Sequence, residues 1–272
     1  TVFQFAAYAE DQIVKYFGDE AVLKMNLGLR YENQLGYSTL QPRINASYGF
    51  NKYVRIRGGY GKTSKTPSLN QLYTGMRYFD QILGDGIYNL PGVGNIAWIE
   101  SVELGENNPN LKPIQSQQAE LGFDVNLPFA SLNVTGFYNK MTDGITTNRI
   151  PLHLSVADID INTTDGSYTV VGEKPLNIFS SELVNDLSSE DKGIEMFLNF
   201  DRIKPLNLDF MINSSYVKTS NSKTINDYEA SSLTSANEIY GVYKPIKSHD
   251  EQFTVGTNFN YHLHKVGLVL SL

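Results

Sequence analysis

Three short stretches of the chain have residue types that occur in chemical sites, and the first is Gly61-Lys62-Thr63. These residues match the end of a phosphate-binding loop. Such a loop also needs a first glycine at position 56, where the chain has Ile56, and a helix after the motif, which the pattern does not indicate. We therefore expect no nucleotide site here.

The second stretch has the opening spacing of a calcium-binding loop. Asp158, Asp160 and Asn162 stand at alternate positions, as the first oxygen ligands of such a loop do. However, Thr163 replaces the turn glycine and Thr169 replaces the bidentate glutamate. A solvated loop is the default expectation, with a calcium site as the alternative.

The third candidate is a histidine pair. His262 and His264 point to the same face of an extended chain, but they flank a short turn and no third ligand accompanies them, so we expect a surface pair. His153 and His249 are isolated, and with so few histidines no Ser/His/Asp grouping can be assembled. The chain has no cysteine either. We predict no catalytic residue, no metal site and no cofactor, and therefore no enzyme.

Aromatic and amide side chains in the longest connection suit a different chemistry. Aromatic faces next to amides can stack on a flat ligand or a sugar ring and donate hydrogen bonds to it. The predicted ligand-binding residues are Tyr78, Phe79, Tyr88, Asn89 and Trp98. The alternative is that they pack a small core of the loop itself or lie at a membrane interface.

The composition favours a β protein. Of 272 residues only 19% are charged, while 17 are Tyr and 14 are Phe, and aromatic residues are enriched in strands. No segment approaches the roughly 18 to 20 consecutive apolar residues of a membrane helix, which excludes a helical membrane protein. The net charge of −7, without clustered Lys or Arg, argues against a nucleic-acid partner. The length allows one large β domain over residues 1–272.

Segments that alternate apolar and polar residues recur along the whole chain, and AELGFDVNL at 119–127 is an example. Its apolar side chains fall on one face of a strand and its polar ones on the other, because successive residues of a strand alternate faces. We expect about ten strands, at residues 2–14, 21–32, 40–50, 53–62, 115–127, 131–142, 190–200, 206–218, 250–262 and 264–272.

The connections between these strands alternate in length. Short ones lie at YFGDE, NK, PFA, RIKP and around Leu263, and long ones occupy residues 33–39, 63–114, 143–189 and 219–249. Short turns at one end and long loops at the other are typical of an outer-membrane barrel, whereas a soluble sandwich has no reason for this asymmetry. The polar face is rich in Asn, Ser, Thr and Gly, as expected of a lumen; a solvated sheet of low charge is the alternative.

Four stretches resemble the TonB-dependent outer-membrane receptors in order and spacing. They are GLRYENQ (28–34), LQPRINASYGF (40–50), RIRGGYGKTSKTPSLNQLY (55–73) and NPNLKPIQSQQAELGFDVNL (108–127). VTGFYNKMTDGITT (134–147) and KGIEMFLNF (192–200) are similar to the next strands of that family, so the resemblance covers nearly the whole chain. Lys65, Thr66 and Ile114 depart from the family pattern and indicate a divergent member.

The resemblance implies an all-β fold, a transmembrane antiparallel up-and-down β-barrel, of which the chain supplies about ten strands of a larger 22-stranded barrel. It also implies a multi-pass protein of the bacterial outer membrane, in contact with its lipid. The function is then uptake of a scarce nutrient, bound by the external loops and imported with energy from the TonB complex, which acts through an N-terminal plug that is missing from this chain.

Several alternatives stay open on the sequence alone. The substrate could be a siderophore, cobalamin, an oligosaccharide or a peptide; the loop composition leans towards an oligosaccharide, as in the SusC-like branch of the family. The competing classes are a passive porin-like barrel or an adhesin, closing at ten strands, and a soluble β-sheet binding protein. A fragment that stays soluble without detergent would contradict the lipid-facing assignment.

Overall fold

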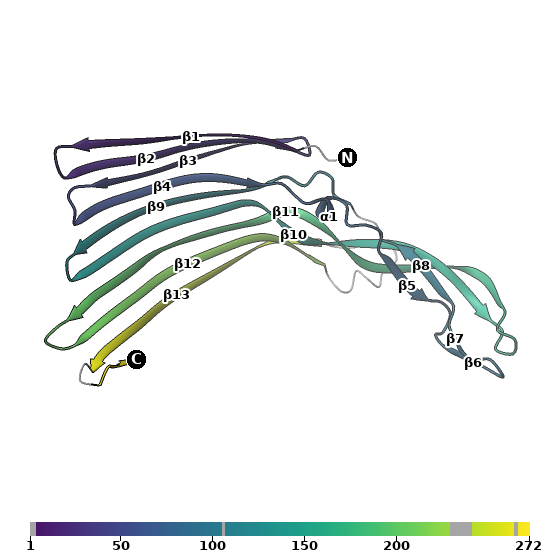
Figure 1. Ribbon diagram of the computed structural model, residues 1–272. Coiled ribbons are helices and arrows are strands. Elements are labelled where there is room, and N and C mark those ends of the chain that lie inside the picture. Colours follow the sequence, from purple (N-terminus) through teal and green to yellow (C-terminus); the bar gives the residue numbers. More distant parts are fainter. Residues whose placement is uncertain (1–3, 105–106, 229–240, 264–265) are drawn as a thin grey trace.

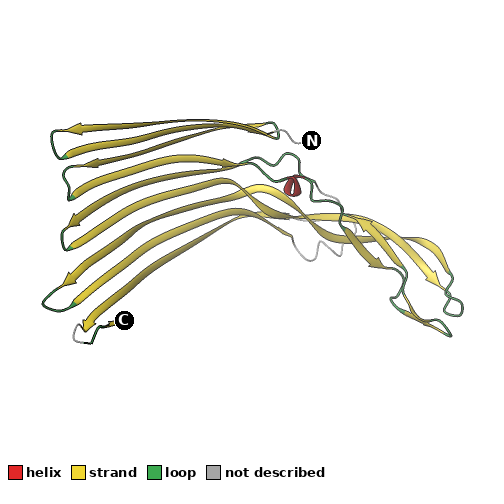
Figure 2. Cartoon of the chain, viewed as in Figure 1, coloured by secondary structure: helices red, strands yellow, loops and turns green. Residues whose placement is uncertain are grey.

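The computed structural model describes residues 4–104, 107–228, 241–263 and 266–272, most of them in one curved antiparallel sheet (Figures 1 and 2). The sheet has ten strands, each hydrogen-bonded to its neighbours, which confirms the expected number and order. In spatial order they are β1 (Gln4–Phe17), β2 (Ala21–Gln34), β3 (Tyr37–Gly49), β4 (Val54–Lys65), β9 (Ile114–Leu127), β10 (Ala130–Ile161), β11 (Tyr168–Ile203), β12 (Leu208–Tyr228), β13 (Gly241–Leu263) and β14 (Leu268–Ser271).

The register of the sheet separates an apolar face from a polar one. Directly paired residues share a face, and one row of pairs crosses nine strands: Ile13, Met25, Ala46, Gly58, Leu121, Gly136, Ile194, Tyr216 and Phe253. Every member is apolar, aromatic or glycine, and Leu121 and Phe253 are 66% and 69% exposed. Because membrane barrels place apolar side chains outward and polar ones in the lumen, this uninterrupted apolar row belongs to the face that meets lipid.

The adjacent row lies on the other face and differs in character. It runs through Gln12, Asn26, Asn45, Gly59, Glu120, Phe137, Gly193, Val217 and Gln252. Polar side chains and glycines dominate, and Phe137 packs where a side chain at Gly193 would otherwise stand. This face is the lumenal wall, and it contains Glu120, Asp124 and Asn126 of the AELGFDVNL segment, as the alternation predicted.

The connection at 33–39 was expected to be long, and that expectation was wrong. β2 and β3 continue to a tight turn at Leu35 and Gly36, whose φ angles are 54° and 81°. Two successive positive φ values match the right-handed twist of a hairpin. Glycine adopts such an angle without strain, whereas leucine rarely does. The bulky Leu35 is why the sequence does not look like a two-residue turn.

The segment at 143–189 was also expected to be a loop, and it is instead a long hairpin. β10 has 32 residues and β11 has 36, and they pair up to Ile161 and Tyr168. Figure 1 shows this hairpin extending to the right, far beyond the ends of β1 to β3. β12 and β13 likewise extend into the expected loop at 219–249, of which 229–240 lies outside the described residues.

A bulge marks the place where the expected strand ended. The pairing shifts between Met141 and Ile145, and Asp143 has a φ of 56°. Asp-Gly is a common turn signal, but here Asp143-Gly144 bends a continuing strand. The side chain of Asn185 fixes the bend: its Nδ2 donates to the carbonyl oxygens of Asp143 (2.7 Å) and Lys112 (3.0 Å).

A small outer lobe forms from the connection between β4 and β9. It contains α1 (Leu69–Leu72), β5 (Tyr78–Ile82), β6 (Tyr88–Leu90), β7 (Gly94–Ile96) and β8 (Ile99–Glu103), with β5 paired to β8 and β6 to β7. Its core packs on the long hairpin through Leu83, Val156 and Ile159. The one-turn helix begins at Ser68, whose backbone N–H donates to Oε1 of Gln71 (2.9 Å). Among the described residues no helix is both long and apolar enough to span a membrane.

Candidate functional site

A charged network holds the lumenal wall together across three strands. Arg57 of β4 contacts Oδ1 of Asp124 on β9 through Nε (3.2 Å) and donates from Nη2 to Oγ1 of Thr135 on β10 (2.6 Å). Asn133 also donates to Oδ1 of Asp124 (3.0 Å). The Asp124 side chain is only 8% exposed, and these partners satisfy its buried charge. The network is a structural part of the wall.

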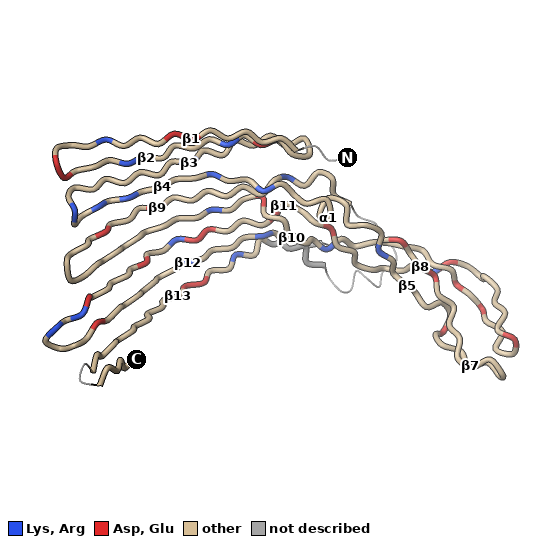
Figure 3. The backbone as a smooth tube through the Cα atoms, viewed as in Figure 1, with Lys and Arg blue, Asp and Glu red and all other residues tan. Residues whose placement is uncertain are grey.

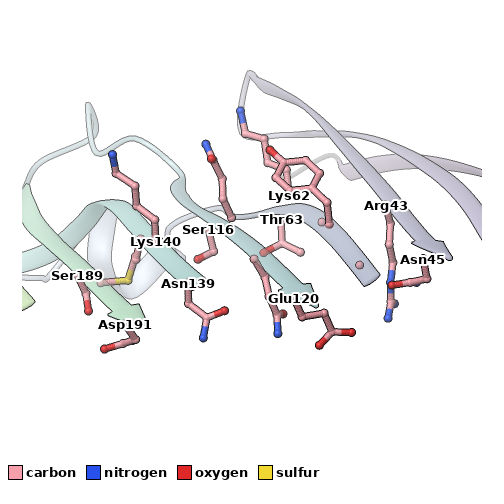
Figure 4. Close-up of a pocket in the computed structure, with 16 residues that line it drawn as sticks. Arg43, Asn45, Lys62, Thr63, Ser116, Glu120, Asn139, Lys140, Ser189 and Asp191 are labelled. Atoms are coloured by element: carbon pink, nitrogen blue, oxygen red, sulfur yellow. The ribbon is translucent and has the colours of Figure 1, made fainter. Parts of the chain in front are cut away.

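A depression of about 540 Å³ lies further out on the same polar face (Figure 4). It exists because Gly59 and Gly61 carry no side chains towards the lumen, so Asn45 and Glu120 lean over the β4 backbone. Figure 4 shows Glu120, Asn139 and Asp191 on one side of the sheet and Lys140 on the other. The depression therefore presents carboxylates and amides to the lumen.

A second depression, of about 420 Å³, lies where the outer lobe meets the long hairpin. Arg77, at the start of the lobe, donates from Nη2 to the Ser181 carbonyl (2.6 Å) and from Nη1 to Ser181 Oγ (3.1 Å). Arg149 of β10 lies 4.1 Å from the ring centre of Phe179 on β11. Tyr78 completes the lining and is 62% exposed. Two guanidinium groups and two aromatic rings therefore face one opening, which we call the outer pocket.

The five predicted ligand-binding residues are not all brought together. Tyr78 lines the outer pocket, and Phe79 projects from the other side of β5. Tyr88 and Asn89 lie in the small hairpin of the lobe, where the Tyr88 hydroxyl accepts a hydrogen bond from the Asp85 backbone (2.7 Å). Trp98 packs against the core between lobe and hairpin, with its ring centre 4.5 Å from that of Tyr168.

The three motifs considered for other chemistry have ordinary structural surroundings. Gly61-Lys62-Thr63 lies within β4, where its side chains alternate faces instead of forming a loop. His262 contacts Oδ2 of Asp209 (2.5 Å), and His264 lies outside the described residues. In the described part of the chain no three His, Cys, Asp or Glu side chains form a group that could hold a metal ion.

The stretch with the spacing of a calcium loop, expected by default to be a solvated loop, is the end of a hairpin. Asp158 and Asp160 belong to β10, and Asp158 is 3.9 Å from the Lys174 ammonium. Asn162 caps the turn by accepting a hydrogen bond from the Thr164 backbone (2.9 Å). Nearby, hydrogen bonds from the side chain and the backbone of Ser167 lower the pKa of Asp165 below its ordinary value.

The sequence interpretation missed Arg149 and Phe179 because the segment at 143–189 was taken as a loop, and it missed Arg77 because the partner of Arg77, Ser181, lies in that segment. A signal was present: Ile150, Leu152, Leu154 and Val156 alternate with other residues, as in a strand with one packed face.

Comparison with known proteins agrees with this architecture. A family model described as "TonB dependent receptor-like, beta-barrel" matches residues 1–262. The chain belongs to this family of TonB-dependent receptors. The sheet is accordingly part of a transmembrane barrel wall, and the protein lies in the bacterial outer membrane, which it crosses with its strands. Members of the family are transport receptors.

Similar TonB-dependent receptors are named for siderophores. The probable TonB-dependent siderophore receptor PirA of Acinetobacter baumannii is 27% identical over 256 residues, covering 89% of this chain and 31% of that protein. The crystal structure of the siderophore receptor PirA from Acinetobacter baumannii has a TM-score of 0.53 at 19% identity and is matched over 96% of this chain and 40% of that one. For PirA from Pseudomonas aeruginosa the TM-score is 0.50 at 19% identity, over 97% and 43%. The chain thus spans less than half of each of these relatives.

Proposed function

We propose that residues 1–272 form one portion of the barrel of a receptor that binds a ferric siderophore outside the cell and imports it. The energy would come from the TonB complex, acting through the plug domain of the receptor. Two facts support the proposal: the membership of the family and the siderophore receptors among the relatives. The sheet is also open, because within the described residues β1 and β14 each pair on one side only, and an open edge in lipid needs further strands.

The outer pocket is the observation that carries the choice of substrate class. Chelators of Fe³⁺ bind it through hard, deprotonated oxygen donors, so their complexes commonly carry negative charge. Arginine binds such oxygens through paired N–H donors, and an aromatic ring under the guanidinium holds its plane in place. Arg149 over Phe179, with Arg77 and Tyr78 beside them, has this composition.

The five aromatic and amide residues predicted from the sequence remain part of this proposal, some in direct contact with the ligand and others further from it. Tyr78 is proposed to contact the ligand within the outer pocket, and Phe79, Tyr88 and Asn89 to border its approach from the lobe. Trp98 is proposed to act indirectly, because its packing on the hairpin holds the lobe in position. A neutral oligosaccharide would use stacking and amide hydrogen bonds without needing the two arginines.

The experiment that tests the proposal compares Arg149→Ala and Arg149→Lys with Lys174→Ala in the full-length receptor. Lys174 is a cation of the same hairpin that lies outside the outer pocket and pairs with Asp158. Loss of a charged hydrogen-bonding group is worth about 1.5–3 kcal/mol, so Arg149→Ala should weaken ferric-siderophore binding by about 10- to 100-fold. Arg149→Lys should lose most of the affinity too, because an ammonium lacks the planar fork.

Equal binding by Arg149→Ala and Lys174→Ala would contradict the ligand site, and binding of a neutral oligosaccharide but no ferric siderophore would contradict the substrate class. Iron uptake that persists in cells without TonB would favour the passive porin-like barrel. A transport role without catalysis is part of the proposal, so the siderophore should be recovered unchanged apart from its iron.

A further inference from the structure

The lipid-facing side of the sheet contains an apolar groove at its external half. The groove has a volume of about 560 Å³ and is lined by Leu121, Gly136, Tyr138, Ile194 and Tyr216, among others. The groove runs over Gly136 on β10. This residue has no side chain, whereas its paired neighbours, Leu121 on β9 and Ile194 on β11, have side chains that project outwards. A β-carbon at Gly136 would have its nearest neighbours at 3.9 and 4.0 Å, both backbone oxygens, so the groove floor is open.

Two lysines stand at the external mouth of this groove. The row of pairs next outward from Gly136 and Ile194 consists of Tyr138, Lys192 and Lys218 on β10, β11 and β12. The Lys192 and Lys218 side chains line the groove and are 56% and 39% exposed. An apolar trough therefore ends at two ammonium groups, at the depth where a tyrosine marks the membrane interface.

The surroundings of the mouth have an excess of positive charge. One row further out on the same face are Lys62 on β4 and Lys140 on β10, and Figure 4 shows both projecting away from the lumenal residues. From β4 to β13 the acidic side chains in these two rows are Glu190 and Glu251, and the row of Tyr138 reaches a third, Asp11, only on the distant strand β1. Near the groove, four lysines therefore outnumber two glutamates. In Figure 3 the backbone positions of Lys and Arg (blue) and of Asp and Glu (red) both occur along β11, β12 and β13.

The glutamates are already engaged. Glu190 accepts a hydrogen bond from the Tyr138 hydroxyl (3.1 Å) and lies 3.5 Å from the Lys192 ammonium. Glu251 accepts from the Tyr216 hydroxyl (3.0 Å) and from Lys218 (2.6 Å). These contacts fix the two ammonium groups beside the groove, and each ammonium has three N–H donors, so donors remain for a further anion.

We propose that this groove binds a phosphorylated lipid of the external leaflet, with one acyl chain along Gly136 and a phosphate group at Lys192 and Lys218. An acyl chain matches the apolar floor, and the excess positive charge selects an anionic over a zwitterionic head group. The lipid occupies the outside of the barrel wall, away from the outer pocket and the lumen. The inference is therefore independent of which nutrient the receptor imports.

Native mass spectrometry of the full-length receptor in detergent tests this, with diphosphoryl lipid A as the anionic probe and phosphatidylcholine as the zwitterionic one. The double variant K192Q/K218Q removes the charge, and Gly136→Ile fills the groove without touching the lysines. The control for charge is K52Q/K204Q, which removes two lysines from the turns at the opposite end of the sheet. The control for bulk is Gly172→Ile, which adds the same side chain to the external hairpin, where a β-carbon meets nothing within 4 Å.

A lysine near an anionic lipid surface is worth about a fivefold change in affinity, so K192Q/K218Q should weaken lipid A binding by about tenfold after allowance for the glutamates. Gly136→Ile should weaken it as well, and neither control should. Heat-modifiable gel mobility reports whether each variant is folded. Equal binding of the two probes by the wild type overturns the charge assignment. An equal loss in the controls, or no loss in either groove variant, overturns the site.

Discussion

Arg57 lies across the position where a side chain at Gly122 would stand. A β-carbon at Gly122 would be 2.8 Å from Cγ, Nε and Cζ of Arg57. The missing side chain lets the guanidinium reach Asp124 and Thr135 on two successive strands.

Gly122→Ala should therefore displace Arg57 and leave the nearly buried Asp124 carboxylate without its cation. We expect the free energy of unfolding to fall by about 1–3 kcal/mol, the usual effect of an unpaired buried polar group, as measured by urea unfolding in detergent. Gly61→Ala, on the same lumenal face of the neighbouring strand β4, is the control, because a β-carbon there meets only Cγ of Arg43 at 3.9 Å. An equal loss of unfolding free energy in both variants would mean that the strands respond to any added methyl group, and not to the displacement of Arg57.

Phe123 and Asn126 test which face meets lipid. Phe123 belongs to the apolar face, and Asn126 belongs to the lumenal wall. A lysine on the lipid side near the middle of the bilayer costs about 2–4 kcal/mol, so Phe123→Lys should reduce assembly into the outer membrane and lower the unfolding midpoint. Asn126→Lys should assemble normally. If a heat-modifiability assay showed that Phe123→Lys assembles normally and Asn126→Lys does not, the lipid-facing and lumenal assignments would have to be exchanged.

Trp98 tests how the outer lobe is attached. It packs against the core cluster that includes Val156 and Ile159 of the hairpin, so Trp98→Ala removes a large, partly buried side chain. The cost should lie below the roughly 3–5 kcal/mol of a fully buried tryptophan. The lobe should become sensitive to proteases while the unfolding of the membrane strands stays unchanged. Tyr78→Ala, which truncates an exposed aromatic residue of the same lobe, should leave the proteolysis pattern as in the wild type.

Asp165 should make the end of the long hairpin sensitive to acid. Its pKa is lowered in the folded turn, chiefly by the hydrogen bond from the Ser167 hydroxyl. The ionised carboxylate therefore stabilises the turn at pH values above the ordinary carboxyl pKa. That stabilisation is lost as the pH falls through the lowered pKa.

Replacing Ser167 with alanine should move the pKa of Asp165 upward. Carboxyl NMR titration of selectively labelled Asp residues measures the change, and Asp158 in the same spectrum serves as the internal reference. An unchanged Asp165 titration in Ser167→Ala would show that the hydroxyl does not cause the shift.

The alternation of residues predicted the ten strands and their two faces well, because hydrophobic patterning reports on the environment of each face. Leu121 and Glu120 were assigned to opposite faces correctly on this basis. The extent of the strands was predicted less well. Asp143-Gly144 has the residue types of a turn, and only the contacts of Asn185 with two separate carbonyl groups turn it into a bulge within a longer strand.

The outer pocket could not be predicted for a related reason. Arg77 and Ser181 are far apart in the sequence, and they meet only because the lobe folds back onto a hairpin that was not expected. Aromatic composition gave Tyr78 as a candidate ligand-binding residue but could not separate it from Trp98, since stacking on a ligand and packing in a core use the same side chains.

The continuity of β10 gives the external hairpin the mechanics of a lever. Its 32 residues would span roughly 105 Å if straight, at about 3.3 Å per residue. The bulge at Asp143 is the natural pivot of this lever, and the Asn185 amide clamps it to the backbone of Lys112. A force applied at the tip of the hairpin is therefore transmitted to the membrane-embedded strands while the two Asn185 hydrogen bonds hold. Once these bonds are broken, the same force bends the strand at the bulge instead.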